Sequence, residues 1–185
     1  MTETIALTSF GDFIDGEARS ERRHDLVGGR VYAMAGGTER HDLAAGLVYE
    51  LLATGARTKR CRPFISNRLV RTRSGNAYYP DVMVACGPAP HRLYETDPAL
   101  VVEMLSPSTA DVDRREKAVA YAEADSLQLL VLVDPGVRRI ELAPPHHGVI
   151  DAWEVCGPGD VLATAFGDVD VDALYDIIDR TATSA

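Results

Sequence analysis

The chain has 185 residues, 46% of them apolar, which supports one hydrophobic core and a single domain over residues 1–185. Its net charge of −9 argues against a protein that coats nucleic acid non-specifically, because contacts to phosphates need clustered lysine and arginine. The sequence shows neither an apolar run of about eighteen residues nor the basic and hydrophobic regions of a signal peptide, so we expect a cytoplasmic protein with no membrane segment.

A hairpin and a helix are the first predicted elements. A Gly-Gly pair separates two short apolar runs within 25–34, a pattern typical of a hairpin with a two-residue turn. A helix is expected over about 39–54, because Thr38 can cap its start and leucines recur along one of its faces. We expect Gly55 to end this helix.

Three strand-like segments follow, at about 63–70, 78–85 and 99–104, separated by polar turns and by Pro- and Gly-rich turns. A second helix near 111–125 and a strand over 127–133 come next. This order of helix, three strands, helix and strand predicts an α/β (α+β) fold. Its central sheet should be mixed, mainly antiparallel and flanked by helices.

The C-terminal part is expected to add a strand pair and a closing helix. The segments 138–143 and 151–156 have the pattern of an antiparallel pair on either side of a Pro-Pro turn. Helical periodicity returns at 171–179. The sequence shows no repeat, linker or low-complexity stretch.

The cysteines are odd in number and widely spaced, at Cys61, Cys86 and Cys156. This spacing matches neither a disulfide framework nor a zinc cluster, so we expect buried free thiols. Seven basic residues gather within 57–73, the one such concentration in the chain. We expect a solvated face there, with a local nucleic-acid contact strip as the alternative.

Two acidic residues interrupt segments that otherwise predict buried strands. Glu103 lies in LVVEMLSPST, an apolar run bounded by Pro98 and by Ser106-Pro107. Desolvating an isolated carboxylate is unfavourable by several kcal/mol, so Glu103 needs a cation, a proton or a cavity. Asp81 follows a proline at the entry of another apolar strand, near the rim of the sheet. If the two strands are neighbours, their carboxylates face each other.

Lys117 is the third candidate, because the chain uses arginine almost everywhere else for positive charge and has only one other lysine, Lys59. Two carboxylates and a lysine suit hydrolysis of a phosphodiester with Mg²⁺, which prefers oxygen ligands and keeps several waters. The structural alternative remains open. Asp113 and Lys117 have the spacing of an ion pair on a helix surface, and Glu103 could pair with a buried arginine.

Four stretches of the sequence together resemble the Uma2 family of restriction endonucleases, a branch of the PD-(D/E)XK nuclease superfamily. In chain order they are YYPDVMVAC, LVVEMLSPST, DRREKAVAY and LVDP. The segments HDLVGGRVYAMAGGTERH and CRPFISNRLV are similar to the N-terminal half of that family, so the likeness runs from about residue 24 to about residue 142. The superfamily core has the same element order, and the resemblance therefore implies a restriction-endonuclease-like core.

The resemblance also implies site residues. Asp81 corresponds to the first aspartate of the family motif and Glu103 to its second acidic residue. The superfamily lysine would stand at Leu105, whereas in the Uma2 branch it has moved to the following helix, where Lys117 matches it. Further family-typical positions are carried as supporting candidates: His41, Asp113, Arg114 and Tyr121.

A metal ion and a nucleic acid follow from the same resemblance. We expect Mg²⁺ (or Mn²⁺) to be held by Asp81, Glu103 and the carbonyl of Met104. DNA is the expected substrate, and a homodimer is one candidate assembly. The chain departs from the family at Asp25, where the family has glutamate, which leaves the role of this residue open. It also departs at Leu130 and Val131, where the family has an aromatic pair.

Two hypotheses of different class follow. The first is a metal-dependent endonuclease that hydrolyses DNA, with Asp81, Glu103 and Lys117 as catalytic residues. The alternative is a catalytically inactive nuclease-like fold that serves as a binding or assembly module. Titration with a divalent metal would discriminate between them.

Overall fold

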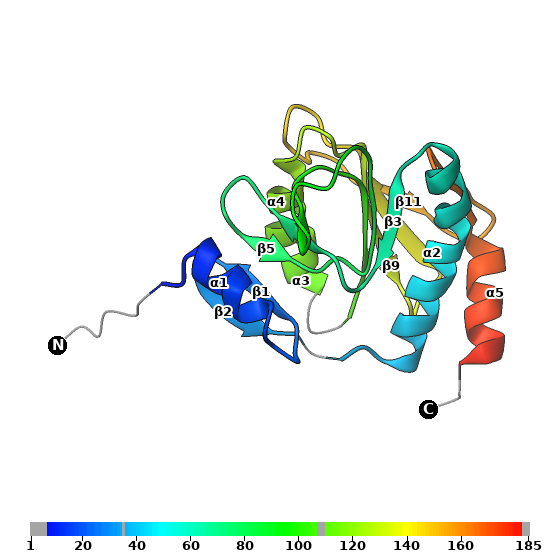
Figure 1. Ribbon diagram of the computed structural model, residues 1–185. Helices are drawn as coiled ribbons and strands as arrows, with labels where there is room; N and C mark the ends of the chain where they lie inside the picture. Colours follow the sequence, from blue (N-terminus) through cyan, green and yellow to red (C-terminus); the bar gives the residue numbers. More distant parts are fainter. Residues whose placement is uncertain (1–6, 35, 107–109, 183–185) are drawn as a thin grey trace.

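The structure is built around a central sheet with helices on both sides (Figure 1). This sheet has six strands in the order β11-β10-β9-β8-β6-β3. A computed structural model describes residues 7–34, 36–106 and 110–182, so Pro107, a predicted strand boundary, lies outside the described residues. Within this sheet β8 and β9 pair in parallel and the other described neighbours pair antiparallel, which confirms a mixed and mainly antiparallel sheet. The strands are β3 (Arg62–Ile65), β6 (Val82–Ala85), β8 (Pro98–Met104), β9 (Leu129–Asp134), β10 (Arg139–Ala143) and β11 (Glu154–Cys156).

Helices cover both faces of this sheet. One face packs against the long helix α2 (Glu39–Thr58), the closing helix α5 (Val171–Thr181) and the hairpin of β12 (Val161–Thr164) and β13 (Gly167–Asp170). The other face packs against a continuous helical segment made of α3 (Ala110–Val112), the π-helix η1 (Asp113–Lys117) and α4 (Ala118–Ala122).

Strand β8 shows how side chains alternate between the two faces. Leu100 and Val102 belong to the core under α2, whereas Val101 belongs to the core under α4, together with Tyr121. Because successive side chains point to opposite faces, Glu103 shares the face of Val101. The carboxylate therefore points toward the helical segment that carries η1 and α4.

A second sheet, of order β2-β1-β5-β4-β7, adjoins the central one and was not anticipated as a separate unit. The helix α1 (Phe10–Glu17), also missed from sequence, packs on it around Phe13, Leu26 and Tyr79. The strands are β1 (His24–Val27), β2 (Arg30–Ala33), β4 (Leu69–Arg71), β5 (Ala77–Tyr78) and β7 (Tyr94–Glu95).

Two predicted strands are each divided between the two sheets. The segment 63–70 breaks at Ser66, which has a φ of 53°, a conformation outside the strand region. The segment 78–85 breaks at Pro80, which has no N–H for a ladder. Asp81 consequently lies at the junction, just before the first residue of β6.

The long helix α2 runs past its predicted end. Thr38 caps it as expected, since its side-chain oxygen accepts a hydrogen bond from the His41 N–H. Gly55 does not end the helix, because α2 continues to Thr58. The glycine has a packing reason instead: a Cβ built there would lie 1.9 Å from the carbonyl oxygen of Phe166 in the β12–β13 turn.

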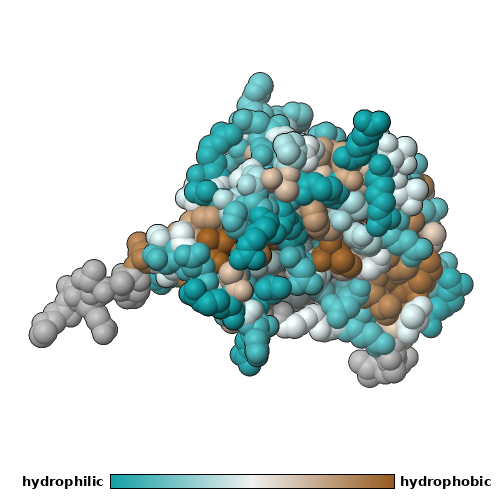
Figure 2. Space-filling model, viewed as in Figure 1, coloured by the Kyte–Doolittle hydropathy of each residue, from teal (hydrophilic) through white to brown (hydrophobic). Residues whose placement is uncertain are grey.

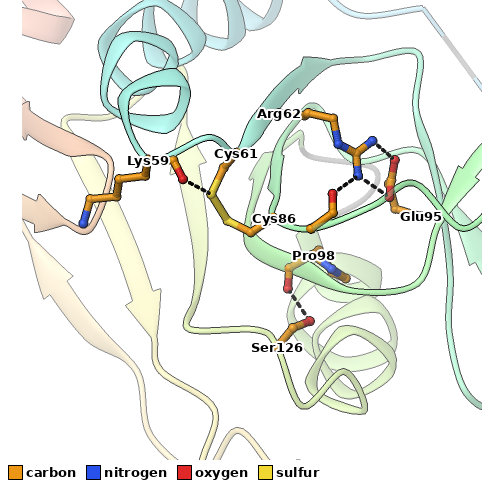
Figure 3. Close-up of a disulfide and its surroundings, with 8 residues drawn as sticks. Lys59, Cys61, Arg62, Cys86, Glu95, Pro98 and Ser126 are labelled. Carbon is orange, nitrogen blue, oxygen red and sulfur yellow. Dashed lines mark hydrogen bonds and ion pairs between the residues drawn. A yellow bond between two sulfur atoms is a disulfide. The ribbon is translucent and has the colours of Figure 1, made fainter.

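The expectation of three free thiols is wrong for two of the cysteines. Cys61 and Cys86 form a disulfide with their Cα atoms 4.3 Å apart (Figure 3), and Cys156 is free. Arg62 pairs with Ala85 between β3 and β6, and the same register continued by one residue sets the two cysteines opposite each other. Because this pairing depends on how distant strands meet, the spacing in the sequence could not show it.

Two of the seven basic residues of 57–73 turn inward to a buried carboxylate instead of belonging to a solvated face. Arg62 and Arg68 each place a guanidinium nitrogen 2.6 Å from the buried carboxylate of Glu95, and Figure 3 shows the Arg62 contact. Arg73 pairs with Asp125 at 2.8 Å. Three of the seven basic side chains are thus bound to carboxylates, which favours a structural role over a nucleic-acid strip.

The visible surface is mostly hydrophilic, with an apolar patch over α2 and α5 (Figure 2). Leu51 and Ile177 are exposed in that region. Among the helices of the described residues, none combines the length and the apolar character needed to cross a bilayer.

Candidate active site

Asp81 and Glu103 lie on adjacent antiparallel strands. Val82 pairs with Val102, and the same register continued by one residue places Asp81 opposite Glu103. The backbone N–H of Met104 donates a 2.7 Å hydrogen bond to Asp81 Oδ2, which fixes the aspartate against the end of β8. Both carboxylates are buried. The strand pairing therefore brings together the two acidic residues that the sequence singled out.

Glu103 is held by two groups from the covering helical segment. The hydroxyl of Tyr121 donates a 2.7 Å hydrogen bond to Glu103 Oε1. The Lys117 ammonium lies 3.3 Å from Glu103 Oε2 and 3.0 Å from Asp113 Oδ1. Asp113 and Lys117 are the first and last residues of η1, and π-helical turns occur frequently at functional sites.

Burial dominates the electrostatics of this cluster. It raises the pKa of Glu103 to about 8, and the charges of Asp81 and Asp113 act in the same direction, against that of Lys117. Burial alone would lower the pKa of Lys117, but Glu103, Asp113 and Asp25 outweigh it and raise that pKa. The ammonium thus stays charged because carboxylates surround it.

His41 reaches the site from the first turn of α2. Its Nε2 lies 3.4 Å from Asp81 Oδ2, and its Nδ1 lies 3.2 Å from Asp42 Oδ1. The hydrogen bond to Asp81 is the main reason why the pKa of His41 is raised to about 9. The histidine therefore carries a positive charge against Asp81 at neutral pH.

Asp25 is a site residue whose role the sequence left open. Its Oδ1 accepts a 3.1 Å hydrogen bond from the N–H of Tyr79. Burial raises the pKa of Asp25 to about 6, opposed mainly by the charge of Lys117 and assisted by those of Asp113 and Glu116. An acidic residue between His24 and an apolar pair in a strand was the available signal, but its neighbours come from the end of β5 and from η1, which lie far away in the sequence.

Most of the predicted site residues come together, with one exception. Asp81, Glu103 and Lys117 join His41, Asp113 and Tyr121 in one cluster. Arg114 does not take part. Its guanidinium binds Glu141 instead, at 3.0 and 2.7 Å.

The cluster suits a hard divalent cation in an open site. Among the described residues, no three side chains of His, Cys, Asp or Glu are grouped as a ready metal cage. Asp81 and Glu103 supply two carboxylates, and Met104 adds a carbonyl at the end of β8, a donor set typical of Mg²⁺ that keeps several waters. The cluster also contains more acidic side chains than the two basic ones, Lys117 and His41, so it can accommodate a further cation.

Two proteins of one Synechocystis strain are similar to this chain. The "Uncharacterized protein slr1290" of Synechocystis sp. (strain ATCC 27184 / PCC 6803 / Kazusa) is 31% identical over 134 residues, which cover 71% of this chain and 70% of the relative. A second protein of the same strain, "Uncharacterized protein sll1609", is 25% identical over 143 residues, 75% of this chain and 81% of its own.

A solved structure from Anabaena variabilis ATCC 29413, described as "a putative nuclease belonging to DUF820", shares the fold. The TM-score is 0.75 at 14% identity, and the match covers 92% of this chain and 98% of the other. The Uma2 family, described as "Putative restriction endonuclease", matches residues 10–165. The resemblance carried by the sequence motifs is therefore confirmed, and this chain, with its nuclease-like fold, belongs to the Uma2 family.

Proposed function

We propose that the protein is a divalent-metal-dependent endonuclease that hydrolyses phosphodiester bonds of DNA with Mg²⁺ or Mn²⁺. The observation that carries the proposal is the buried Lys117 ammonium 3.3 Å from Glu103, on the strand next to Asp81. The choice of DNA rests on the family description, restriction endonuclease.

Asp81, Glu103 and the Met104 carbonyl would hold the metal ion, which when bound polarises the phosphodiester and lowers the pKa of a water. Tyr121 orients Glu103 through its 2.7 Å hydrogen bond, and the Met104 N–H does the same for Asp81. These contacts fix both carboxylates before a ligand arrives, which reduces the reorganisation needed during reaction.

Lys117 is the group that would act on the reacting atoms. Its ammonium, held by Glu103 and Asp113, can orient the attacking water by a hydrogen bond and stabilise negative charge that develops on the phosphoryl oxygens. A lysine serves here as a compact point charge with three donors. His41 contacts the neighbouring ligand, with its Nε2 3.4 Å from Asp81 Oδ2.

The test is nicking of supercoiled plasmid in Mg²⁺ and in Mn²⁺ by the wild type and by Glu103→Gln. The amide keeps the shape and the acceptor for Tyr121 but cannot lose a proton to become an anionic metal ligand, so we expect loss of nicking. A matched control is Glu141→Gln, because Glu141 is also buried but is paired with Arg114 and Arg139 away from the cluster. This control should cut at the wild-type rate.

Calorimetric titration with Mn²⁺ complements the assay. The wild type and Glu141→Gln should bind the metal, and Glu103→Gln should not. A wild type that binds Mn²⁺ but cleaves neither DNA nor RNA would contradict the endonuclease and favour a binding module. A wild type that cuts equally well in EDTA would contradict the metal dependence.

A further inference from the structure

Strand β1 directs Asp25 toward the helical segment of the site. Leu26 is buried in the core of the second sheet, and its neighbour Val27, on the other face of β1, packs against the cluster that contains Tyr78 and Tyr121. Side chains two positions apart share a face of a strand, so Asp25 lies on the side of Val27. The carboxylate thus reaches the site from the second sheet.

The backbone holds Asp25 in this place. Leu26 pairs with Ala77 between β1 and β5, and the N–H of Tyr79 donates a 3.1 Å hydrogen bond to Asp25 Oδ1. Tyr79 stands two residues before Asp81 in the same connecting segment. The position of Asp25 is therefore coupled to that of the predicted metal ligand.

Lys117 is the cation whose charge acts most strongly on Asp25, although the two side chains do not form a direct ion pair. Two further carboxylates raise the pKa of Asp25, those of Asp113 and Glu116 in η1. Asp25 in turn raises the pKa of three tyrosines: Tyr78 and Tyr79 at the end of β5, and Tyr121 of α4. In return, Asp25 is one of three carboxylates that favour the charged form of Lys117, with Glu103 and Asp113.

A lysine in this setting needs more than one carboxylate to stay in place. Its ammonium sits on a flexible stem of four carbons, and Glu103 and Asp113 contact it directly. A divalent cation bound at Glu103 would repel the ammonium and compete for the same carboxylate. Negative charge away from the metal ligands is then what keeps Lys117 beside them.

We propose that Asp25 is a positioning residue for Lys117: together with Asp113 it holds the ammonium beside Glu103, including when the metal occupies the two ligand carboxylates. The consequence for DNA cleavage rests on the function proposed above. The consequence for the motion of the Lys117 side chain does not.

The experiment uses the fact that the chain has only two lysines, Lys59 and Lys117. Protein labelled with ¹³C and ¹⁵N at lysine gives one set of side-chain NMR signals from the site and one from Lys59, which is exposed. Relaxation of the Cε group reports how strongly each side chain is held, and it is measured without metal and with saturating Mg²⁺. Lys59 serves as the mobile internal reference.

The variants are Asp25→Asn, Asp25→Glu and the control Glu17→Gln. Asparagine keeps the acceptor for the Tyr79 N–H but removes the charge, whereas glutamate restores the charge. Glu17 is a buried carboxylate that also binds Tyr79, through the hydroxyl at 3.1 Å, but it lies outside the cluster. The control therefore separates loss of the Asp25 charge from a general disturbance around Tyr79.

We expect the Lys117 order parameter in Asp25→Asn to fall toward that of Lys59, most strongly with Mg²⁺ present. Asp25→Glu should recover it, and Glu17→Gln should match the wild type. The proposal would be overturned if the Lys117 order parameter were unchanged in Asp25→Asn, or if Glu17→Gln lowered it by the same amount.

Cleavage kinetics supply the second readout. For Asp25→Asn, kcat should fall about ten- to a hundred-fold, as is typical when a partner of a site residue is lost, while KM for DNA and the Mn²⁺ affinity stay unchanged. A rise in KM with an unchanged kcat would overturn the positioning role. If the wild type itself cuts no DNA, the proposed function fails, and the relaxation data still decide the role of Asp25.

Discussion

Lys117 contacts Glu103 Oε2 at 3.3 Å and Asp113 at 3.0 Å through the same ammonium. From sequence, the catalytic interpretation and the helix ion pair with Asp113 were alternatives. In the structure both contacts exist, and both are buried rather than exposed to solvent. The helix pair is therefore part of the site, because it helps to aim the lysine at the strand carboxylate.

Replacement of Lys117 should affect both activity and stability. Loss of one such electrostatic contact lowers turnover by about a hundred- to a thousand-fold, so Lys117→Ala should nearly abolish plasmid nicking. Removing one partner of a buried ion pair costs about 3–5 kcal/mol, less where the carboxylate left behind takes up a proton. Urea unfolding and nicking are measured beside Lys59→Ala, an exposed lysine. If the two variants behave alike, Lys117 has no special role.

His41 should give the metal-free protein a stability that depends on pH. Its pKa is raised from the ordinary 6.5 to about 9 by the hydrogen bond to Asp81, so folding favours the protonated ring. This contribution is complete below pH 6.5 and is lost as the pH rises through about 9. The free energy of unfolding of wild type minus His41→Ala, measured in urea from pH 6 to 10, should decline over that interval. If the difference in the free energy of unfolding were constant or increased with pH, it would contradict the pairing of His41 with Asp81.

Two glycines of α2 should respond in opposite ways to alanine. A Cβ at Gly55 would lie 1.9 Å from the backbone oxygen of Phe166, so Gly55→Ala must displace the hairpin and should destabilise by about 1–3 kcal/mol or more. Apart from the adjoining helix backbone, no described atom lies within 4 Å of a Cβ at Gly46, and alanine there should stabilise the helix by up to about 1 kcal/mol. Thermal unfolding of both variants checks the prediction. Equal shifts in Tm would show that the short distance between Gly55 and Phe166 does not affect stability.

The disulfide should add measurable stability. It closes a loop with a sequence separation of 25 residues, for which chain entropy predicts about 3 kcal/mol. The double variant Cys61→Ala/Cys86→Ala should unfold at lower urea, and dithiothreitol should destabilise the wild type but not the variant. Thiol titration of the denatured wild type should find one free thiol before reduction, that of Cys156, and three after it. Three thiols before reduction would refute the bridge.

Much of the candidate site could be predicted because its residues are unusual for their positions in the sequence. A glutamate in an apolar strand is unfavourable without compensation, and this anomaly at Glu103 is visible without a structure. Asp81 shows the same signal at the entry of its strand. Lys117 stood out because the chain rarely uses lysine and because the family has a lysine on that helix. The order of helices and strands followed from periodicity.

What escaped prediction depends on contacts between distant segments. Asp25 joins the site because β1 pairs with β5 in a second sheet, and a short hairpin does not reveal its partner. The bond between Cys61 and Cys86 needs the register of β3 and β6. The break at Ser66, which passes the chain from one sheet to the other, requires a positive φ that serine seldom adopts and that periodicity does not indicate.

The disulfide has a topological consequence for Asp81. The bond between Cys61 and Cys86 makes the segment between them a closed covalent ring, and Asp81 is a member of that ring. A protease that cuts the turn at Gly75 would leave two fragments still joined through sulfur, with Asp81 on the fragment that carries Glu103 and Lys117. Those three residues stay on one fragment with or without the bond, but His41 lies on the other. In the oxidised chain the disulfide is therefore what keeps His41 covalently joined to the proposed catalytic groups after a nick in this turn.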